Sequence, residues 1–417
     1  MQSRPAMRTR AMRLVLAVTA SCAIAYGVAC GSDESGENVA TTGPGNGSGG
    51  GNGGQPSPSN ENQPNTTPPN PDDEQGVDGP AQVQFVGRFE TTDPAGPKAS
   101  WPGSKIITRF VGTDISVKLL EIAEDWMDGA PSYWEVSIDG GDPKVIPMIA
   151  DLQPHDFELA TGLPPGKHTV QLYKRSEMQT GVTQFLGFDL KGGKALAPPP
   201  RLNRHIEIMA DSYGTGYGIE NLDAPNLECG INHAGKYQNF HKAYASLLGA
   251  RFNAEVEGTV YSGKGLLRGI WPTDDDGLVE YYDRSNPNPA LAYNPPLYDL
   301  KSWVPDAIIL VQGTVDNGMG NFYGVYRDFV VNQLRARAPN AHIFLVVPGR
   351  VARDKFIATV TALEKERHDA GDLNVHAVIP TEEVPEEMTA CGYHGSPLFH
   401  QRVATEIGAV MSATMGW

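Results

Sequence analysis

The fold is decided by the stretch His205-Ile-Glu-Ile-Met-Ala-Asp-Ser-Tyr-Gly-Thr-Gly-Tyr-Gly218. It begins with apolar residues at every second position, the periodicity of a β-strand, and then turns into Asp211-Ser212 and a glycine-rich segment. A strand that ends in this way places the Ser212 hydroxyl at the carboxyl edge of a sheet, where open α/β sheets bind ligands. An Asp-Ser pair in this position is also typical of a turn or a helix cap. The rest of the chain has to decide between a catalytic serine and such a structural role.

The chain beyond this stretch alternates strands with amphipathic helices. Further strands are expected at Ala254–Tyr261, Asp306–Gln312, Ala341–Val347 and Val375–Ile379, and helices at Lys236–Arg251, Phe322–Arg337, Lys355–His368 and Pro397–Met415. Repeated βα units predict a parallel sheet with right-handed crossovers. Residues 201–417 are therefore predicted to form an α/β domain.

Four loops are expected to meet at one edge of this sheet. Ser212 follows the first strand and Gly263 the second; residues 313–317 follow the third strand, and His394 precedes the last helix. A serine hydroxyl needs a base to become a nucleophile, so Ser212 and His394 are the predicted catalytic pair for acyl transfer. The backbone N–H groups of Ser212 and Gly263 would hold the developing oxyanion. The alternative for His394 is a loop histidine that caps the following helix.

The aromatic residues of the long insert between the second and third strands include Trp271, Tyr281 and Tyr282. Aromatic faces suit sugar rings, so these residues are predicted to bind substrate at the active edge. The alternative is that they only hold the insert against the core.

Residues 81–195 show an all-β pattern of short alternating runs separated by Gly, Pro and Asp turns. The runs are Val83–Val86, Ile106–Val111, Ile115–Leu120, Tyr133–Ile138 and His168–Tyr173. This spacing predicts a β-sandwich or jelly roll, with a structural role or a role as a wall for a glycan. The proline-rich junction Ala195–Arg201 suggests that the two domains pack against each other.

The N-terminal part of the chain is expected to be a targeting segment and a tether. Residues 1–29 combine arginines with an apolar stretch, as in a secretory signal, and Gly27-Val-Ala-Cys30 resembles a bacterial lipobox. Acylation of Cys30 would anchor the protein, whereas an ordinary signal peptide cut nearby is the alternative. Residues 30–80, rich in Gly, Asn and Pro, are expected to be a disordered tether. The expected location is the bacterial cell envelope, lipid-anchored at the outer membrane or cell surface, or outside the cell.

Composition excludes several classes of partner. The net charge of −16 argues against nucleic acid as the main partner. No histidine shows a recognisable ligand spacing with Cys, Asp or Glu, and no phosphate loop is present, so neither a metal nor a cofactor is expected.

Cys229 and Cys391 form an even pair in an oxidising compartment, either as a disulfide or as two buried free thiols. We expect a monomer.

The four loops match a known pattern in their order. Ala210-Asp-Ser, Ser262-Gly-Lys-Gly, Gly313-Thr-Val-Asp and Gly392-Tyr-His resemble the four blocks of the SGNH hydrolases. The front segment, with motifs such as Trp101-Pro-Gly-Ser, Tyr173-Lys-Arg-Ser-Glu and Gln184-Phe-Leu-Gly-Phe, resembles the N-terminal jelly roll of carbohydrate esterase family two. The resemblance implies a jelly roll before a flavodoxin-like SGNH domain, and a serine esterase that removes O-acetyl groups from xylan or glucomannan.

Two positions depart from that pattern. Val315 stands where the family usually has an asparagine that donates to the oxyanion, and Asn317 is a candidate substitute. Gly392 stands where the family usually has an aspartate, which implies a Ser212–His394 dyad with the histidine oriented by a backbone carbonyl. Two alternatives remain at this point, a catalytically degenerate glycan-binding protein and an esterase that acts on acetyl groups of the cell envelope.

Overall fold

The computed structural model describes residues 75–123, 131–222, 234–270, 276–288, 291, 294–318 and 320–417. The predicted signal peptide, the lipidation site Cys30, most of the tether, Cys229 and Trp271 lie outside the described residues.

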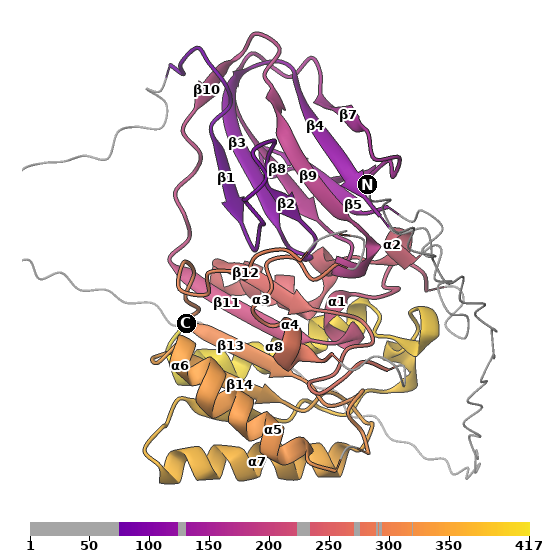
Figure 1. The fold of residues 1–417 in the computed structure, drawn as a ribbon, viewed down its shortest axis with the longest axis vertical. Helices are drawn as coiled ribbons and strands as arrows, with labels where there is room; N and C mark the ends of the chain where they lie inside the picture. Colours follow the sequence, from indigo (N-terminus) through magenta and orange to yellow (C-terminus); the bar gives the residue numbers. More distant parts are fainter. Residues whose placement is uncertain are drawn as a thin grey trace, which may run out of the picture. The chain divides into compact units, whose positions relative to one another are not determined.

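The C-terminal part of the chain is built on a five-stranded parallel sheet (Figure 1). Its strands are β11 (Arg204–Ala210), β12 (Ala254–Val260), β13 (Ala307–Val311), β14 (His342–Val346) and β15 (Val375–Val378). They lie in the order β12-β11-β13-β14-β15, and all four pairings are parallel. This confirms the predicted α/β class.

Helices cover both faces of this sheet. Successive residues of each strand point to opposite sides, and because both sets contain apolar residues, both faces have to be buried. One face packs against α3 (Tyr244–Phe252) and α8 (Pro397–Met415). The other packs against α7 (Arg353–Asp369) and a helical run made of α5 (Phe322–Asp328), the π-helical segment η6 (Phe329–Leu334) and α6 (Arg335–Arg337). Each face of the sheet therefore has its own hydrophobic core. Ile208 of β11 packs in the core on the α3 and α8 side, and its neighbour Met209 packs in the core on the α7 side.

The helix expected over residues 236–251 is broken, and the prediction of one continuous helix is wrong. The structure has α2 (Ala234–Tyr237), a 3-10 turn η5 (Phe240–Lys242) and then α3. Asn239 has an extended backbone (φ −151°), and its side chain accepts the His241 N–H at 3.0 Å. This local bond offers the backbone an alternative to the helix, so the chain turns here.

The N-terminal domain is an antiparallel β-sandwich, as expected. One sheet contains β1 (Val83–Val86), β3 (Lys105–Gly112), β8 (Gly166–Lys174), β5 (Tyr133–Ile138) and β6 (Lys144–Pro147), with β10 (Lys194–Leu196) paired to β3. The other contains β2 (Lys98–Ala99), β9 (Val182–Asp189), β4 (Ile115–Ile122) and β7 (Pro154–Ala160). Val77 forms a bridge with Ala195, so pairing with the sandwich begins inside the range predicted as tether.

Side chains from the sandwich enter the two cores of the α/β domain. Tyr173 belongs to the core below α3 and α8, while Trp101 and Met178 belong to the core on the other face. Arg88 of the sandwich is buried and donates to Glu207 at 2.5 Å and to Glu257 at 3.2 Å. These contacts join the two domains through apolar packing and paired charges.

None of the helices in the described part of the chain has the length and apolar character that crossing a bilayer requires.

Candidate active site

Ser212 is the first residue of α1 (Ser212–Thr215), a single helical turn that follows β11 directly. Asp211 caps this turn, and its Oδ1 accepts the Tyr213 N–H at 3.0 Å. Gly216 ends the turn with a left-handed backbone (φ 72°), and a Cβ here would lie 2.4 Å from the carbonyl oxygen of Asn239. The glycine-rich sequence therefore lets the chain turn sharply while Ser212 stays partly exposed at the carboxyl edge of the sheet.

His394 lies beside Ser212 although 182 positions separate them in the sequence. Its Nε2 is 2.8 Å from Ser212 Oγ, and its Nδ1 is 3.0 Å from the backbone carbonyl oxygen of Cys391. A carbonyl oxygen only accepts, so the proton of the neutral ring is on Nδ1 and Nε2 accepts from the serine hydroxyl. Burial lowers the pKa of His394, while the Cys391 and Gly392 backbone groups act in the opposite direction. The neutral ring is the form that can take a proton from a hydroxyl.

Position 392, two residues before His394, holds a glycine rather than an aspartate. Gly392 has a left-handed backbone (φ 61°), and a Cβ there would lie 3.4 Å from His394 Nδ1. A residue with a side chain would be strained in this conformation. The Cys391 carbonyl takes the position of the hydrogen-bond acceptor instead. Cys391 is disulfide-bonded, and Cys229, the partner considered from the sequence, lies outside the described residues.

The loop after β12 lies next to Ser212, as the sequence predicts for adjacent parallel strands. The Tyr261 N–H donates to the Ala210 carbonyl at 3.1 Å, and Ser262 Oγ lies 3.3 Å from Thr215 Oγ1. Gly263 follows with a left-handed backbone (φ 76°). The N–H groups of Ser212 and Gly263 thus come from two neighbouring loops at one edge of the sheet.

The loop after β13 contains Val315, Asp316 and Asn317, which differ in exposure: Val315 is half-buried, Asn317 is exposed, and Asp316 is fully buried. The Asp316 carboxylate accepts the N–H groups of Leu266 at 2.8 Å and Leu267 at 2.9 Å. It therefore fixes the segment that follows Gly263. Sequence reasoning assigned no role to Asp316, although it ends the third block.

The structure corrects the prediction that Tyr281 and Tyr282 contact substrate. Only 1% of Tyr281 and 4% of Tyr282 is exposed. The Tyr281 ring packs at 6.1 Å from Trp101, and the Tyr282 ring at 5.3 Å from Phe329. Both rings hold the insert to the core, which was the alternative considered from the sequence.

An exposed aromatic residue stands beside His394 instead. Tyr393 is 59% exposed and has a left-handed backbone (φ 57°), which is uncommon for a residue with a side chain. The half-buried Tyr217 also packs against His394, with a distance of 4.7 Å between the two ring centroids. The signal for Tyr393 in the sequence was its place between Gly392 and His394.

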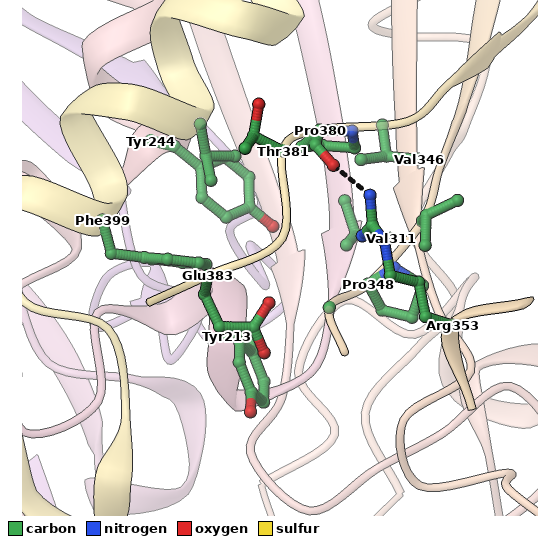
Figure 2. Close-up of a pocket in the computed structure, with 13 residues that line it drawn as sticks. Tyr213, Tyr244, Val311, Val346, Pro348, Arg353, Pro380, Thr381, Glu383 and Phe399 are labelled. Carbon is green, nitrogen blue, oxygen red and sulfur yellow. Dashed lines mark hydrogen bonds between the residues drawn. The ribbon is translucent and has the colours of Figure 1, made fainter. Parts of the chain in front are cut away.

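A small cavity lies next to α1, lined by Tyr213, Tyr244, Phe399 and Glu383 and by the ends of β13 and β14 (Figure 2). Arg353 borders it and donates to the Pro380 carbonyl. Its volume of about 20 Å³ suits a single water molecule. A cavity of this size does not admit a sugar ring.

Larger clefts lie elsewhere. One of about 510 Å³ is lined by Phe85, Tyr298 and Trp303, among other residues, and neither Ser212 nor His394 lines it.

One cluster of possible metal ligands exists in the described part of the chain, although none was expected from the sequence. Atoms of Glu364, His368 and His376 lie within 4.8 Å of one another. Glu364 accepts the Ala377 N–H at 2.8 Å, and His368 Nε2 donates to the Val375 carbonyl at 2.8 Å. These bonds connect α7 to β15. Glu364 and His368 therefore have a structural role between the helix and the strand, and this role explains why they lie close to His376. The overlooked signal was the i, i+4 spacing of Glu364 and His368.

Known proteins share this architecture. A family model described as carbohydrate esterase 2 N-terminal matches residues 85–200. The chain is 29% identical over 347 residues to the cellulase/esterase CelE of Acetivibrio thermocellus, covering 80% of this chain and 40% of that protein. It is 30% identical over 243 residues to an acetylxylan esterase / glucomannan deacetylase of Cellvibrio japonicus, covering 57% of this chain and 62% of that protein. The chain therefore spans less than two thirds of the length of either relative.

Solved structures agree over the folded part. A family two carbohydrate esterase from Clostridium thermocellum in complex with cellohexaose superposes with a TM-score of 0.71 at 26% identity, covering 81% of this chain and all (100%) of that one. A family two carbohydrate esterase from Cellvibrio japonicus shares the fold, with a TM-score of 0.70 at 23% identity over 82% of this chain and 97% of that one. Residues 85–200 therefore match the N-terminal domain of carbohydrate esterase family 2, and the folded part of the chain, including the α/β domain that carries Ser212 and His394, is similar to family two carbohydrate esterases.

Proposed function

We propose that this protein is a serine esterase that removes O-acetyl groups from a polysaccharide, with Ser212 as nucleophile and His394 as general base. The observation that carries the proposal is the 2.8 Å contact between Ser212 Oγ and His394 Nε2. The acceptor at Nδ1, the Cys391 carbonyl at 3.0 Å, supports the required tautomer. A nucleophile, a base and a group that orients the base are the parts that acyl transfer needs.

In the proposed reaction, Ser212 Oγ attacks the acetyl carbonyl carbon while its proton passes to His394 Nε2. The carbonyl oxygen becomes an oxyanion, for which the N–H groups of Ser212 and Gly263 are the candidate donors. The bond between the carbonyl carbon and the sugar oxygen then breaks, His394 gives its proton to that oxygen so that the sugar leaves as a free hydroxyl, and Ser212 remains acetylated. Water, deprotonated by His394, attacks this acetyl-enzyme, releases acetate and restores the serine.

The proposed substrate class rests on an exposed aromatic residue next to the dyad in the sequence. The exposed Tyr393 ring, next to His394, offers an apolar face on which a sugar ring can stack. The relatives include an acetylxylan esterase / glucomannan deacetylase, which supports acetylated plant polysaccharide as the first substrate to test. Acetyl groups of the cell envelope are the competing substrate.

The test is acetate release by the purified full-length chain from acetylated xylan, acetylated glucomannan, O-acetylated peptidoglycan and 4-nitrophenyl acetate. Ser212→Ala is expected to abolish release with nearly unchanged thermal melting. Tyr393→Ala is expected to raise KM for the polysaccharide severalfold more than KM for the aryl acetate. Equal activity of Ser212→Ala and the parent would contradict the assignment.

A glycan-binding protein without catalysis is the second candidate, and Val315 is the observation that favours it. Valine carries no side-chain donor for an oxyanion, so position 315 cannot supply the hydrogen bond that an asparagine would give there. This candidate predicts that the parent binds xylan or cello-oligosaccharides while it releases no acetate from any of the four substrates.

We also propose that Cys30 carries the lipid that anchors the protein at the cell envelope. Metabolic labelling with a fatty-acid analogue is expected to label the parent and to leave Cys30→Ser unlabelled. Labelling of Cys30→Ser would contradict the proposal.

A further inference from the structure

One buried carboxylate of the N-terminal domain reaches the catalytic edge of the other domain. Glu177 lies just beyond β8 and is fully buried. Its Oε2 accepts the backbone N–H of Ser262 at 2.9 Å, across 85 positions of sequence. Ser262 immediately precedes Gly263, the candidate oxyanion donor.

The carboxylate itself is held in one orientation by a side-chain pair. The Glu177 backbone N–H donates to Gln238 Oε1 at 2.9 Å, and Gln238 Nε2 donates in return to Glu177 Oε1. Lys174 Nζ donates to the Glu177 carbonyl at 3.2 Å. Burial raises the pKa of Glu177, and the Ser262 N–H and the Lys174 charge counteract the shift. A group fixed on both oxygens can in turn fix the backbone that donates to it.

The loop that receives this bond is otherwise tied to Ser212. Ser262 Oγ lies 3.3 Å from Thr215 Oγ1 in the turn that begins with Ser212, and Tyr261 is bonded to Ala210. Without Glu177, the partly buried Ser262 N–H would be left without its acceptor. Water entry or rotation of the peptide would then move Gly263, because the Gly263 N–H belongs to the next peptide unit.

We propose that Glu177 is a positioning residue that holds the Ser262–Gly263 loop in the geometry required for oxyanion stabilisation. The N-terminal sandwich is then a working part of the active site rather than only a neighbouring domain. This inference rests on the proposed esterase function. A donor that acts mainly in the transition state changes kcat more than KM, which separates positioning from substrate binding.

The experiment compares full-length variants on 4-nitrophenyl acetate. Glu177→Ala is expected to lower kcat by about tenfold or more with KM changed less than about threefold. Glu177→Gln combined with Gln238→Glu exchanges the two groups, so that an amide oxygen accepts from Ser262 while the buried charge is conserved. This double variant is expected to recover most of the lost kcat. Hydrogen exchange of the peptide that contains Ser262 is expected to speed up in Glu177→Ala and to slow again in the double variant.

Tyr173→Phe is the matched control. The Tyr173 hydroxyl makes a buried contact between the domains, 2.5 Å from Ser246 Oγ, and it does not touch the Ser262 loop. This variant is expected to lose some thermal stability and to keep the parent kcat. An active parent whose Glu177→Ala variant keeps its kcat overturns the positioning role alone. Equal kcat losses in Glu177→Ala and Tyr173→Phe also overturn it, because they would reflect general loosening of the domains. A parent without esterase activity overturns the proposed function and this inference together.

Discussion

At the scale of the single residue, the proposed reaction depends on the protonation of His394. Burial lowers its pKa from the ordinary value of 6.5. The base has to be neutral, so activity is lost as the pH falls through this pKa, and a lowered pKa moves the loss to more acidic pH. The acid limb of kcat/KM for 4-nitrophenyl acetate is expected to have its midpoint below pH 6.5. A midpoint above this value would show that another group controls the limb.

Val315 is the second residue with a testable consequence. If only backbone N–H groups hold the oxyanion, Val315→Asn is expected to raise kcat by up to about tenfold with little change in KM, because the new bond forms mainly in the transition state. Asn317→Ala is the paired variant and is expected to have little effect, since Asn317 is exposed. If Asn317→Ala is the damaging change, Asn317 already supplies the donor. If neither variant alters kcat, this loop does not contribute to the oxyanion site.

At the scale of the element, Asp316 links the loop after β13 to the loop after β12. Asp316→Ala removes the acceptor of two backbone N–H groups, at Leu266 and Leu267. The Leu266 N–H is buried, and a buried donor left without a partner costs about 1–3 kcal/mol, so the melting temperature is expected to fall clearly. Asp316→Asn keeps one acceptor oxygen and is expected to lose less. The control is Asp299→Ala, since Asp299 is exposed and accepts the Lys301 N–H at 3.1 Å. Equal melting temperatures for the two alanine variants would contradict this account.

At the scale of the whole molecule, Arg88 joins the sandwich to the sheet of the α/β domain. It pairs with Glu207 and Glu257, and its guanidinium lies 5.0 Å from the Tyr298 ring centroid. Glu207 keeps Arg337 as a second partner. Arg88→Met therefore leaves Glu257 as the less compensated buried carboxylate, and breaking such a pair costs about 3–5 kcal/mol.

The melting temperature of Arg88→Met is expected to fall by several degrees, measured by calorimetry on the full chain. Lys191→Met is the control, because Lys191 and Asp189 form an exposed pair at 2.8 Å, and such pairs contribute little. A shift no larger than that of the control would show that the buried network does not hold the domains together.

The sequence by itself determined the strands of the parallel sheet, the last helix and the order of the four blocks. The alternation in β11 and the helical spacing in α8 are local patterns, and both elements were predicted close to their observed bounds. The placement of Ser212 and His394 on loops of one sheet edge followed from parallel topology, because every strand then ends at the same edge. The sandwich was predicted from alternating runs that match β1 and β5.

Only the tertiary structure decided which side chains meet. The sequence could not tell that Tyr281 and Tyr282 face the core, because an insert without periodicity gives no indication of its buried side. It could not show the break at Asn239, where a side-chain bond competes with the helix, or the bond from Glu177 to Ser262. Periodicity does not report a single side-chain bond such as the one at Asn239, and the Glu177–Ser262 contact depends on how two domains pack. Ser212 and His394 each lie in a short motif that can be recognised in the sequence. The residues that hold their loops in place, such as Glu177, lie in no such motif and were found only in the tertiary structure.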